Sequence, residues 1–344
     1  MKLMKTEEAV GQVLCHDITQ IIPGVTKDAV FRKGHIITKE DIPVLLSVGK
    51  EHIYIWEKDE HMLHENEAAQ ILYEMCQNKH MHPSDVKEGK IELIADCDGL
   101  FKVDREKLRK VNSLGEMMIA TRHGNTFVKK GDKLAGTRII PLVIEKEKME
   151  RAKEICNDGS ILEIKPLQPK KAAILTTGSE VYHGRIKDKF TPVLVEKLKE
   201  YGSEVIFHEI YDDDHEAITK GCLSAIEQGA ELVLCTGGMS VDPDDKTPLA
   251  IKNTGARIVS YGAPVLPGAM FLVSYYEYKD KTIPIVGLPG CVMYAKRTIF
   301  DLALPRLLAD DFITAEELAL LGEGGLCLNC PVCTYPNCGF GKGW

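Results

Sequence analysis

Apolar runs of strand length alternate with helix-like segments between residues 170 and 310. Runs such as AAILTT and ELVLCT are almost wholly apolar, which is typical of strands buried on both faces of a parallel sheet. One helix-like segment opens on Thr191 and Pro192 and stops at Gly202. The alternation predicts the α/β class, with a three-layer, doubly wound and mostly parallel sheet. The strand-like runs cover 172–177, 204–210, 231–238, 257–262 and 283–290, and the helix-like segments cover 191–202, 212–229 and 294–308.

Other regions precede and follow this domain. An N-terminal α+β region is followed by a mixed, β-rich region, in which two strands flank a turn at Asp98 and Gly99. Two prolines and three lysines in 165–171 mark a boundary before the α/β domain. The predicted regions are 1–58, 59–164, the α/β domain at 170–310 and a cysteine-rich tail at 322–344.

Composition narrows the class of protein. The chain has 344 residues and 44% hydrophobic residues, enough for two or three domains with their own cores. A formal net charge of −8 argues against a nucleic-acid partner, which requires a basic face. No apolar run approaches the roughly 18 residues of a membrane span, and the N-terminus lacks a secretory signal. We therefore expect a cytoplasmic protein that binds neither membranes nor nucleic acid.

Three glycine-bearing turns fall at the carboxyl ends of predicted strands. They are TTGSE at 176–180, CTGGMS at 235–240 and GLPG at 287–290. In an open parallel sheet, ligands bind beyond this edge, and glycines let the backbone approach them closely. Exposed amides and hydroxyls in such turns bind phosphate groups. The pattern alone predicts a pocket for an anion or a nucleotide.

An acidic segment follows the second turn. Its carboxylates are Asp242, Asp244 and Asp245, and Mg²⁺ binds carboxylate and phosphate oxygens. A second interpretation is helix capping, in which Asp245 or Thr247 starts a helix just before Leu249. Both interpretations remain open from the sequence.

Four cysteines are concentrated in the tail. The C-x₂-C-x₂-C-x₄-C spacing is typical of a metal site with four thiolates, and it suits either Zn²⁺ or an iron–sulfur cluster. The alternative is a disordered, redox-active tail. The expected ligands are Cys327, Cys330, Cys333 and Cys338.

The motifs TTGSEV, DDDHEAI, CTGGMSVDPDDKTP and GLPG together resemble the molybdopterin-binding domain. That domain is shared by molybdopterin adenylyltransferases, molybdopterin molybdotransferases and competence-damage-type proteins. GQVLCHDI, FRKGHIIT and LLSVGKEHIYI also resemble the N-terminal part of a molybdotransferase. The resemblance implies that the three turns hold the phosphate of the pterin. The substrate-binding residues it implies are Thr177, Gly178, Ser179, Glu180, Asp188, Thr236, Gly237, Gly238, Ser240, Pro289 and Gly290.

The resemblance also implies an activity. In a molybdotransferase, adenylylated molybdopterin and molybdate meet a divalent metal, AMP leaves and molybdenum passes to the dithiolene. Asp242 and Asp245 would then be the catalytic residues, with Asp242 as a ligand of Mg²⁺. A homodimer is expected by analogy.

Three departures from the molybdotransferase pattern leave catalysis open. Lys189 replaces the usual Asn, Cys291 follows GLPG, and the N-terminal Pro-Phe-x-x-Ser-x-Met-Asp-Gly-Tyr-like stretch is absent. The alternative is a non-catalytic carrier of molybdopterin, or an insertion chaperone whose tail docks on a molybdoenzyme. A third hypothesis, an adenylyltransferase or nucleotide pyrophosphatase, is disfavoured by the additional N-terminal regions.

Overall fold

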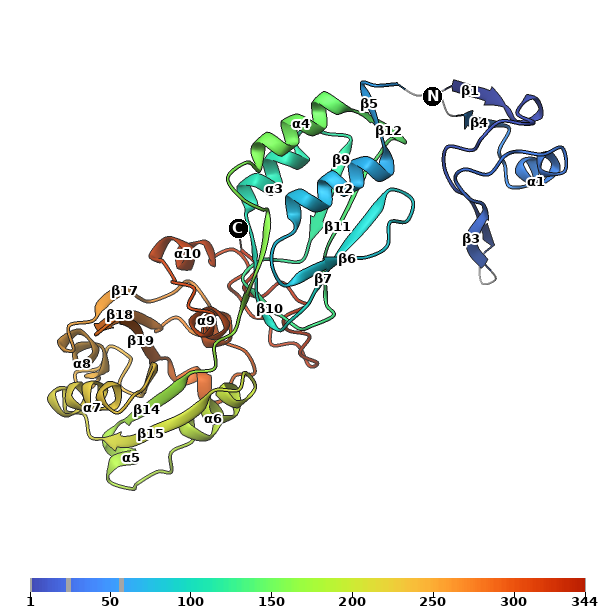
Figure 1. Ribbon diagram of the computed structural model, residues 1–344. Helices are drawn as coiled ribbons and strands as arrows, with labels where there is room; N and C mark the ends of the chain where they lie inside the picture. The colour runs from blue at the N-terminus through green and yellow to red at the C-terminus, as the bar shows by residue number, and fades with distance from the viewer. Residues whose placement is uncertain (1, 23–25, 56–58, 344) are drawn as a thin grey trace. The chain divides into compact units, whose positions relative to one another are not determined.

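The computed structural model describes residues 2–22, 26–55 and 59–343 (Figure 1). The chain separates into two compact units that interleave along the sequence. Unit 1 comprises Met1–Asp96, Val103–Arg122 and Lys130–Glu163, and unit 2 comprises Cys97–Lys102, His123–Lys129 and Ile164–Trp344. None of the helices in the described ranges combines the length and the apolar character needed to cross a bilayer.

Unit 1 begins with small antiparallel pairs around a compact apolar core that includes Leu14, Ile18 and Leu45. The pairs join β1 (Lys2–Lys5) to β4 (His52–Ile55) and β2 (Ile18–Ile22) to β3 (Thr26–Phe31), beside the helices η1 (Thr6–Glu8) and α1 (Asp41–Ser47). The predicted domain boundary at residue 58 lies outside the described residues.

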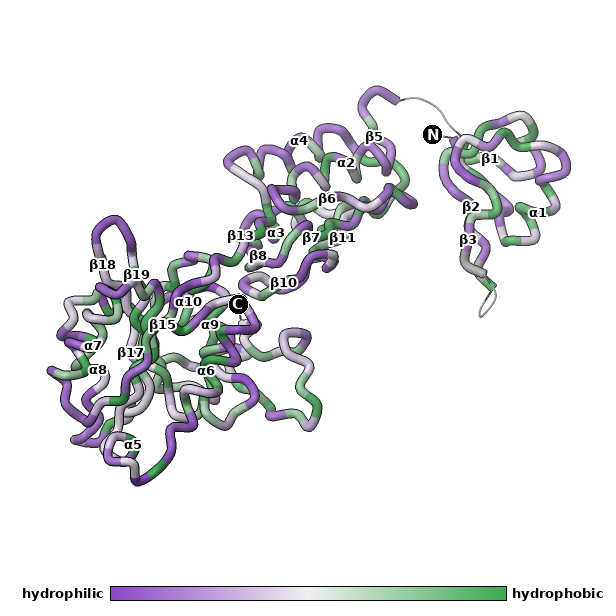
Figure 2. Tube along the Cα trace, turned by 60° about the horizontal axis from the view of Figure 1, so that its bottom comes forward, coloured by the Kyte–Doolittle hydropathy of each residue, from purple (hydrophilic) through white to green (hydrophobic). Residues whose placement is uncertain are grey.

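The rest of unit 1 is an antiparallel sheet with amphipathic helices. Figure 2 shows hydrophilic and hydrophobic residues alternating along α2 and α4, as expected for helices that bury one face. The sheet order is β6 (Met81–Pro83), β7 (Lys90–Ala95), β11 (Lys133–Ile139) and β9 (Met117–Thr121), and β5 (Met62–His64) pairs with β12 (Val143–Glu145). The helices are α2 (Glu65–Cys76), α3 (Arg105–Asn112) and α4 (Lys146–Ile155).

The two strands around Asp98 and Gly99 do not form a hairpin. β7 belongs to the sheet of unit 1, whereas β8 (Gly99–Val103) lies between β10 (Thr126–Val128) and β13 (Leu162–Pro166). A Cβ at Gly99 would lie 2.5 Å from Cγ2 of Ile164, so the glycine permits close packing against β13. Both predicted strands exist on either side of Asp98, but they pair with different partners and not with each other.

Unit 2 contains a six-stranded sheet, and the α/β class is confirmed. Five of its strands match the predicted runs, and the strand at Leu272–Tyr278 was not predicted. Four neighbouring strands are parallel, and the fifth strand in the spatial order pairs antiparallel with the strand on each side of it. The spatial order is β15 (Glu204–Tyr211), β14 (Lys171–Thr177), β16 (Leu232–Thr236), β19 (Lys281–Leu288), β18 (Leu272–Tyr278) and β17 (Arg257–Tyr261).

Helices cover both faces of this sheet, and Figure 1 shows α7 and α8 on the side opposite α6 and α9. Successive residues of a strand point to opposite faces. Ile174 and Leu234 thus join the core that includes residues of α6 and α9, and Leu175 and Val233 join the core that includes residues of α7 and α8. The helices are α5 (Ser179–Tyr182), α6 (Phe190–Lys199), α7 (His215–Glu227), α8 (Thr247–Asn253), η2 (Gly290–Met293), α9 (Ile299–Leu308) and α10 (Ala315–Leu320).

The cysteine-rich tail packs against the α/β domain. Leu326 bridges to Leu266 in parallel fashion, and the Leu266 amide donates to the Gly325 carbonyl at 2.8 Å. Phe340 is only 5% exposed and belongs to the same core as α9. Residues 322–343 are therefore folded onto the domain, rather than forming the disordered tail considered as an alternative.

Candidate functional site

A cavity of about 1070 Å³ opens at the carboxyl end of β14, beside the loop that follows β16. This is the edge where ligands bind in open parallel sheets. The segments that line it are the first turn at 176–181, the loop at 186–190, Asp212 and Asp213, and parts of the second loop between 237 and 245. Met293 of η2 also contributes. Segments far apart in the sequence thus meet at one cavity.

The first and second turns approach each other too closely for side chains. A Cβ at Gly237 would lie 2.1 Å from the Thr177 carbonyl oxygen, and the φ of Gly237 is +83°. Gly238 has a φ of +52°, and a Cβ there would lie 2.9 Å from Oγ1 of Thr247. The hydroxyls of Thr177 and Thr247 are hydrogen-bonded at 3.0 Å in the interior. The two glycines therefore let the turns pack together at the edge of the cavity.

An aspartate contacts the first amide of α5. The Ser179 N–H, which follows Gly178, donates to Oδ2 of Asp213 at 3.0 Å. Burial raises the pKa of Asp213; the Ser179 bond opposes this, and the nearby carboxylates, Asp212 first, raise the pKa further. The Asp213 carboxylate thus accepts a hydrogen bond from a backbone amide of the kind that binds phosphate groups.

Asp188 holds the start of α6. Its Oδ1 accepts hydrogen bonds from the amides of Phe190 and Thr191 at 2.8 and 3.1 Å. Its Oδ2 accepts from the hydroxyls of Thr191 and Thr176, and Nε2 of His208 lies 3.4 Å away. Burial would raise the pKa of Asp188, but these hydrogen bonds, with Thr191 as the strongest donor, hold it below the ordinary value. α6 begins at Phe190, so Thr191 lies inside the helix and the prediction that the helix opens on Thr191 is wrong by one residue.

The acidic segment after the second turn folds on itself. The Asp245 amide donates to the Asp242 carbonyl at 3.0 Å, and the Asp242 amide lies 3.2 Å from Oδ2 of Asp245. Asp242, Asp244 and Asp245 all line the cavity. The N-cap of α8 is Lys246, which makes no side-chain capping bond, so Asp245 does not cap this helix. The capping interpretation fails, and all three carboxylates remain at the cavity.

Most of the predicted substrate-binding residues line this cavity, and four do not. Thr236 is fully buried, and its hydroxyl has no hydrogen-bond partner. Ser240 is exposed, and Pro289 and Gly290 lie outside the lining. The third turn instead reaches the cavity through Met293. The predicted residues that do line the cavity are Thr177, Gly178, Ser179, Glu180, Asp188, Gly237, Gly238, Asp242 and Asp245.

The lining is strongly acidic, with seven carboxylates and two lysines. Sequence reasoning missed Asp212 and Asp213, because capping of α7 accounts for an aspartate run before a helix. Asp214 does cap α7 through the Glu216 amide, which leaves its two neighbours at the cavity. In the described ranges, no group of three or more His, Cys, Asp or Glu residues is placed to hold a metal ion. The charged lining residues are Glu180, Asp188, Asp212, Asp213, Asp242, Asp244, Asp245, Lys187 and Lys189.

Comparison with known proteins assigns this domain to a family. Residues 173–309 match a family model described as "Probable molybdopterin binding domain". These residues therefore belong to the molybdopterin-binding domain family of molybdenum cofactor biosynthesis. Residues 3–57 match a second family model, described only as a domain of unknown function.

Individual curated proteins are similar to parts of this chain. A molybdopterin adenylyltransferase of Pyrococcus furiosus is 27% identical over 135 residues, covering 39% of this chain and 76% of the relative. A molybdopterin molybdenumtransferase of a Nostoc strain is 26% identical over 196 residues, covering 55% of this chain and 44% of the relative. The chain thus spans less than half of the transferase. The solved structure of the tungsten cofactor synthesizing protein MoaB from Pyrococcus furiosus is 21% identical, covers 36% of this chain and 84% of that chain, and has a TM-score of 0.32.

Proposed function

We propose that the cavity at the carboxyl end of β14 binds molybdopterin or its adenylylated form, and that the protein takes part in molybdenum insertion. The observation that carries the proposal is the meeting of the two glycine turns with Asp242 and Asp245 at one cavity of about 1070 Å³. Amides and hydroxyls of the turns would bind the phosphate, and the acidic segment would act at the phosphoanhydride. Molybdate would be the second substrate.

Mg²⁺ suits this acidic lining. It is usually bound through one or two carboxylates together with substrate phosphates and water, rather than by a cage of protein ligands. Asp242 and Asp245 are the residues we propose as its ligands, because both reach the cavity from one turn. When bound, the ion would supply positive charge to the phosphate oxygens.

A single-turnover assay tests the proposal. The full chain is mixed with adenylylated molybdopterin, Mg²⁺ and molybdate, and AMP release is followed. Asp245→Ala should slow the release by roughly 100-fold or more, as expected for loss of a group that stabilises transition-state charge. Asp280→Ala is the matched control, because this exposed carboxylate lies outside the cavity.

The outcomes separate the two candidate roles. If the ligand binds and AMP is not released, the protein is a carrier or insertion chaperone for a molybdoenzyme, the role that Lys189 and Cys291 favour. If the ligand does not bind at all, molybdopterin binding at this cavity is refuted. The expected homodimer is tested in the same preparation by light scattering.

A further inference from the structure

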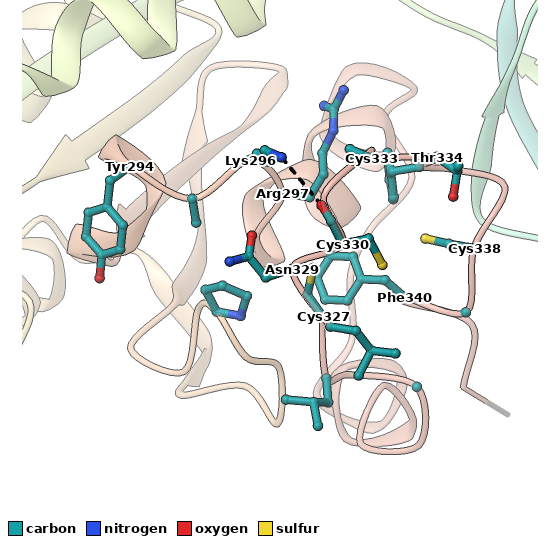
Figure 3. A pocket seen from close by; sticks show the side chains of 17 residues that line it. Tyr294, Lys296, Arg297, Cys327, Asn329, Cys330, Cys333, Thr334, Cys338 and Phe340 are labelled. Carbon is teal, nitrogen blue, oxygen red and sulfur yellow. Dashed lines mark hydrogen bonds between the residues drawn. The ribbon is translucent and has the colours of Figure 1, made fainter.

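The tail forms a second cavity, of about 410 Å³, on the α/β domain. All four tail cysteines line it, together with Phe340 and the segment 294–297 that follows η2. Figure 3 shows the side chains of Cys330 and Cys338 directed towards each other across this space. The four cysteines of the tail therefore line one cavity.

The tail is anchored to the segment 294–297 and to α9 at several points. The Lys296 ammonium donates to the carbonyls of Cys330 and Pro331 at 3.4 and 3.1 Å. The Arg297 guanidinium lies 5.0 Å from the centre of the Tyr335 ring, and the Tyr335 hydroxyl donates to the Asp301 carbonyl at 3.0 Å. The thiols are thus held next to the domain by contacts that do not involve sulfur.

The surroundings suit thiolates. Lys296 brings a positive charge to the lining, which would offset part of the negative charge of a four-thiolate centre. Arg297 also lines the cavity, but its guanidinium is paired with Asp301 at 2.8 Å. Cys330 and Cys333 are exposed, and residues 327–330 form neither helix nor strand. In the described structure the sulfurs are not clustered, so metal binding requires this loop to move. Small movements of an exposed loop of this kind require little loss of packing.

We propose that Cys327, Cys330, Cys333 and Cys338 bind one thiolate-ligated metal centre in this cavity, and that the centre immobilises the segment 294–297. Each thiol loses its proton when it binds the metal. Met293 lines the first cavity and Tyr294 lines the tail cavity, so the centre would act on the polypeptide next to the proposed ligand site. This inference goes beyond the proposed function and does not rest on it.

Metal analysis of the full chain tests the site. The protein is purified anaerobically, and zinc, iron and visible absorbance are measured before and after reconstitution with Zn²⁺ or with ferrous iron and sulfide. One zinc per chain without colour, or a coloured iron–sulfur cluster, supports the centre. Cys330→Ser together with Cys333→Ser should weaken binding by roughly 100-fold or more, since even outer contacts of metal sites contribute 10–100-fold. Cys156→Ser, in unit 1, is the matched control and should bind as the wild type does.

Two further results decide the proposal. The proposal would be overturned if the protein bound metal in neither reconstitution, or if the double variant bound metal as strongly as the wild type. Hydrogen exchange then reports on the segment. Amides of 294–297 should exchange at least tenfold more slowly after metal loading, whereas those of α7 should be unchanged. Metal binding without this slowing would refute the immobilisation of the segment.

Discussion

Replacement of Gly237 by alanine tests the close approach of the two turns. The new Cβ would lie 2.1 Å from the Thr177 carbonyl oxygen, so the backbone of one turn must move. The residue would also keep a φ of +83°, which costs an L-residue about 1–2 kcal/mol. Overpacking adds about 1–3 kcal/mol. We expect Gly237→Ala to lower the free energy of unfolding by about 2–5 kcal/mol.

Alanine variants of two other glycines distinguish the cost of backbone strain from the cost of a steric clash. Gly229 has a φ of +101°, and a Cβ added there would meet no atom within 4 Å, so alanine should cost only the strain, about 1–2 kcal/mol. Gly290 has neither a positive φ nor a close neighbour. Gly290→Ala should therefore be neutral, or stabilising by a few tenths of a kcal/mol through the entropy of the unfolded chain.

Urea unfolding, followed by circular dichroism, measures the three variants. The urea midpoint should be highest for Gly290→Ala, lower for Gly229→Ala and lowest for Gly237→Ala. The slope of the free energy of unfolding against urea concentration should be the same in all three. Equal midpoints for the Gly229 and Gly237 variants would refute the argument, because the close contact at Gly237 would then add no cost to the strain that both positions share. Phosphate binding should also be weakened in the Gly237 variant alone, since only this glycine of the three lies at the cavity.

Two charge substitutions give further predictions. Burial would raise the pKa of Asp311, but Arg306 and two lysines lower it to about 2. Because this is below the unfolded value, its stabilisation of about 2 kcal/mol is complete above pH ~4 and is lost as the pH falls towards 2. Asp311→Asn should remove that pH dependence of urea unfolding, whereas Asp310→Asn, which changes an exposed carboxylate, should cost under about 1 kcal/mol. Asp213→Asn should bind pyrophosphate roughly tenfold more tightly by calorimetry, because one competing negative charge is removed. Unchanged or weaker binding, or the same gain in Asp310→Asn, would contradict this.

The central strands β14 and β16 of the sheet of unit 2 could be predicted because they are buried on both faces. Residues 172–175 are all buried and alternate between two cores, which leaves a continuous apolar run in the sequence. The turns at the strand ends follow from the same pattern, since parallel strands place their carboxyl ends at one edge. The start of α6 was harder to predict from the sequence. The carboxylate that accepts the Phe190 amide belongs to Asp188, two residues upstream of the helix.

Long-range pairing is the part that local signals do not contain. Asp98 and Gly99 have the composition of a hairpin turn, yet the strand that follows pairs with β10 and β13. The aspartates before α7 present the same difficulty at the site. A capping role explains Asp214 completely, and only the placement of β14 beside β15 brings Asp213 to the Ser179 amide.

The acidity of the first cavity limits how a phosphate ligand can enter. Seven carboxylates against two lysines repel an anion, and the Ser179 amide already donates to one of those carboxylates. A phosphate that arrives alone must displace Asp213 and approach Asp242 and Asp245 without compensation. A phosphate that arrives with a divalent cation meets the opposite situation, because the carboxylates become ligands and the amide can be exchanged for a phosphate oxygen. Pyrophosphate binding should therefore strengthen with Mg²⁺, and Asp242→Asn should reduce that dependence; binding that is equally strong in EDTA would refute the coupling of the glycine turns to the acidic segment.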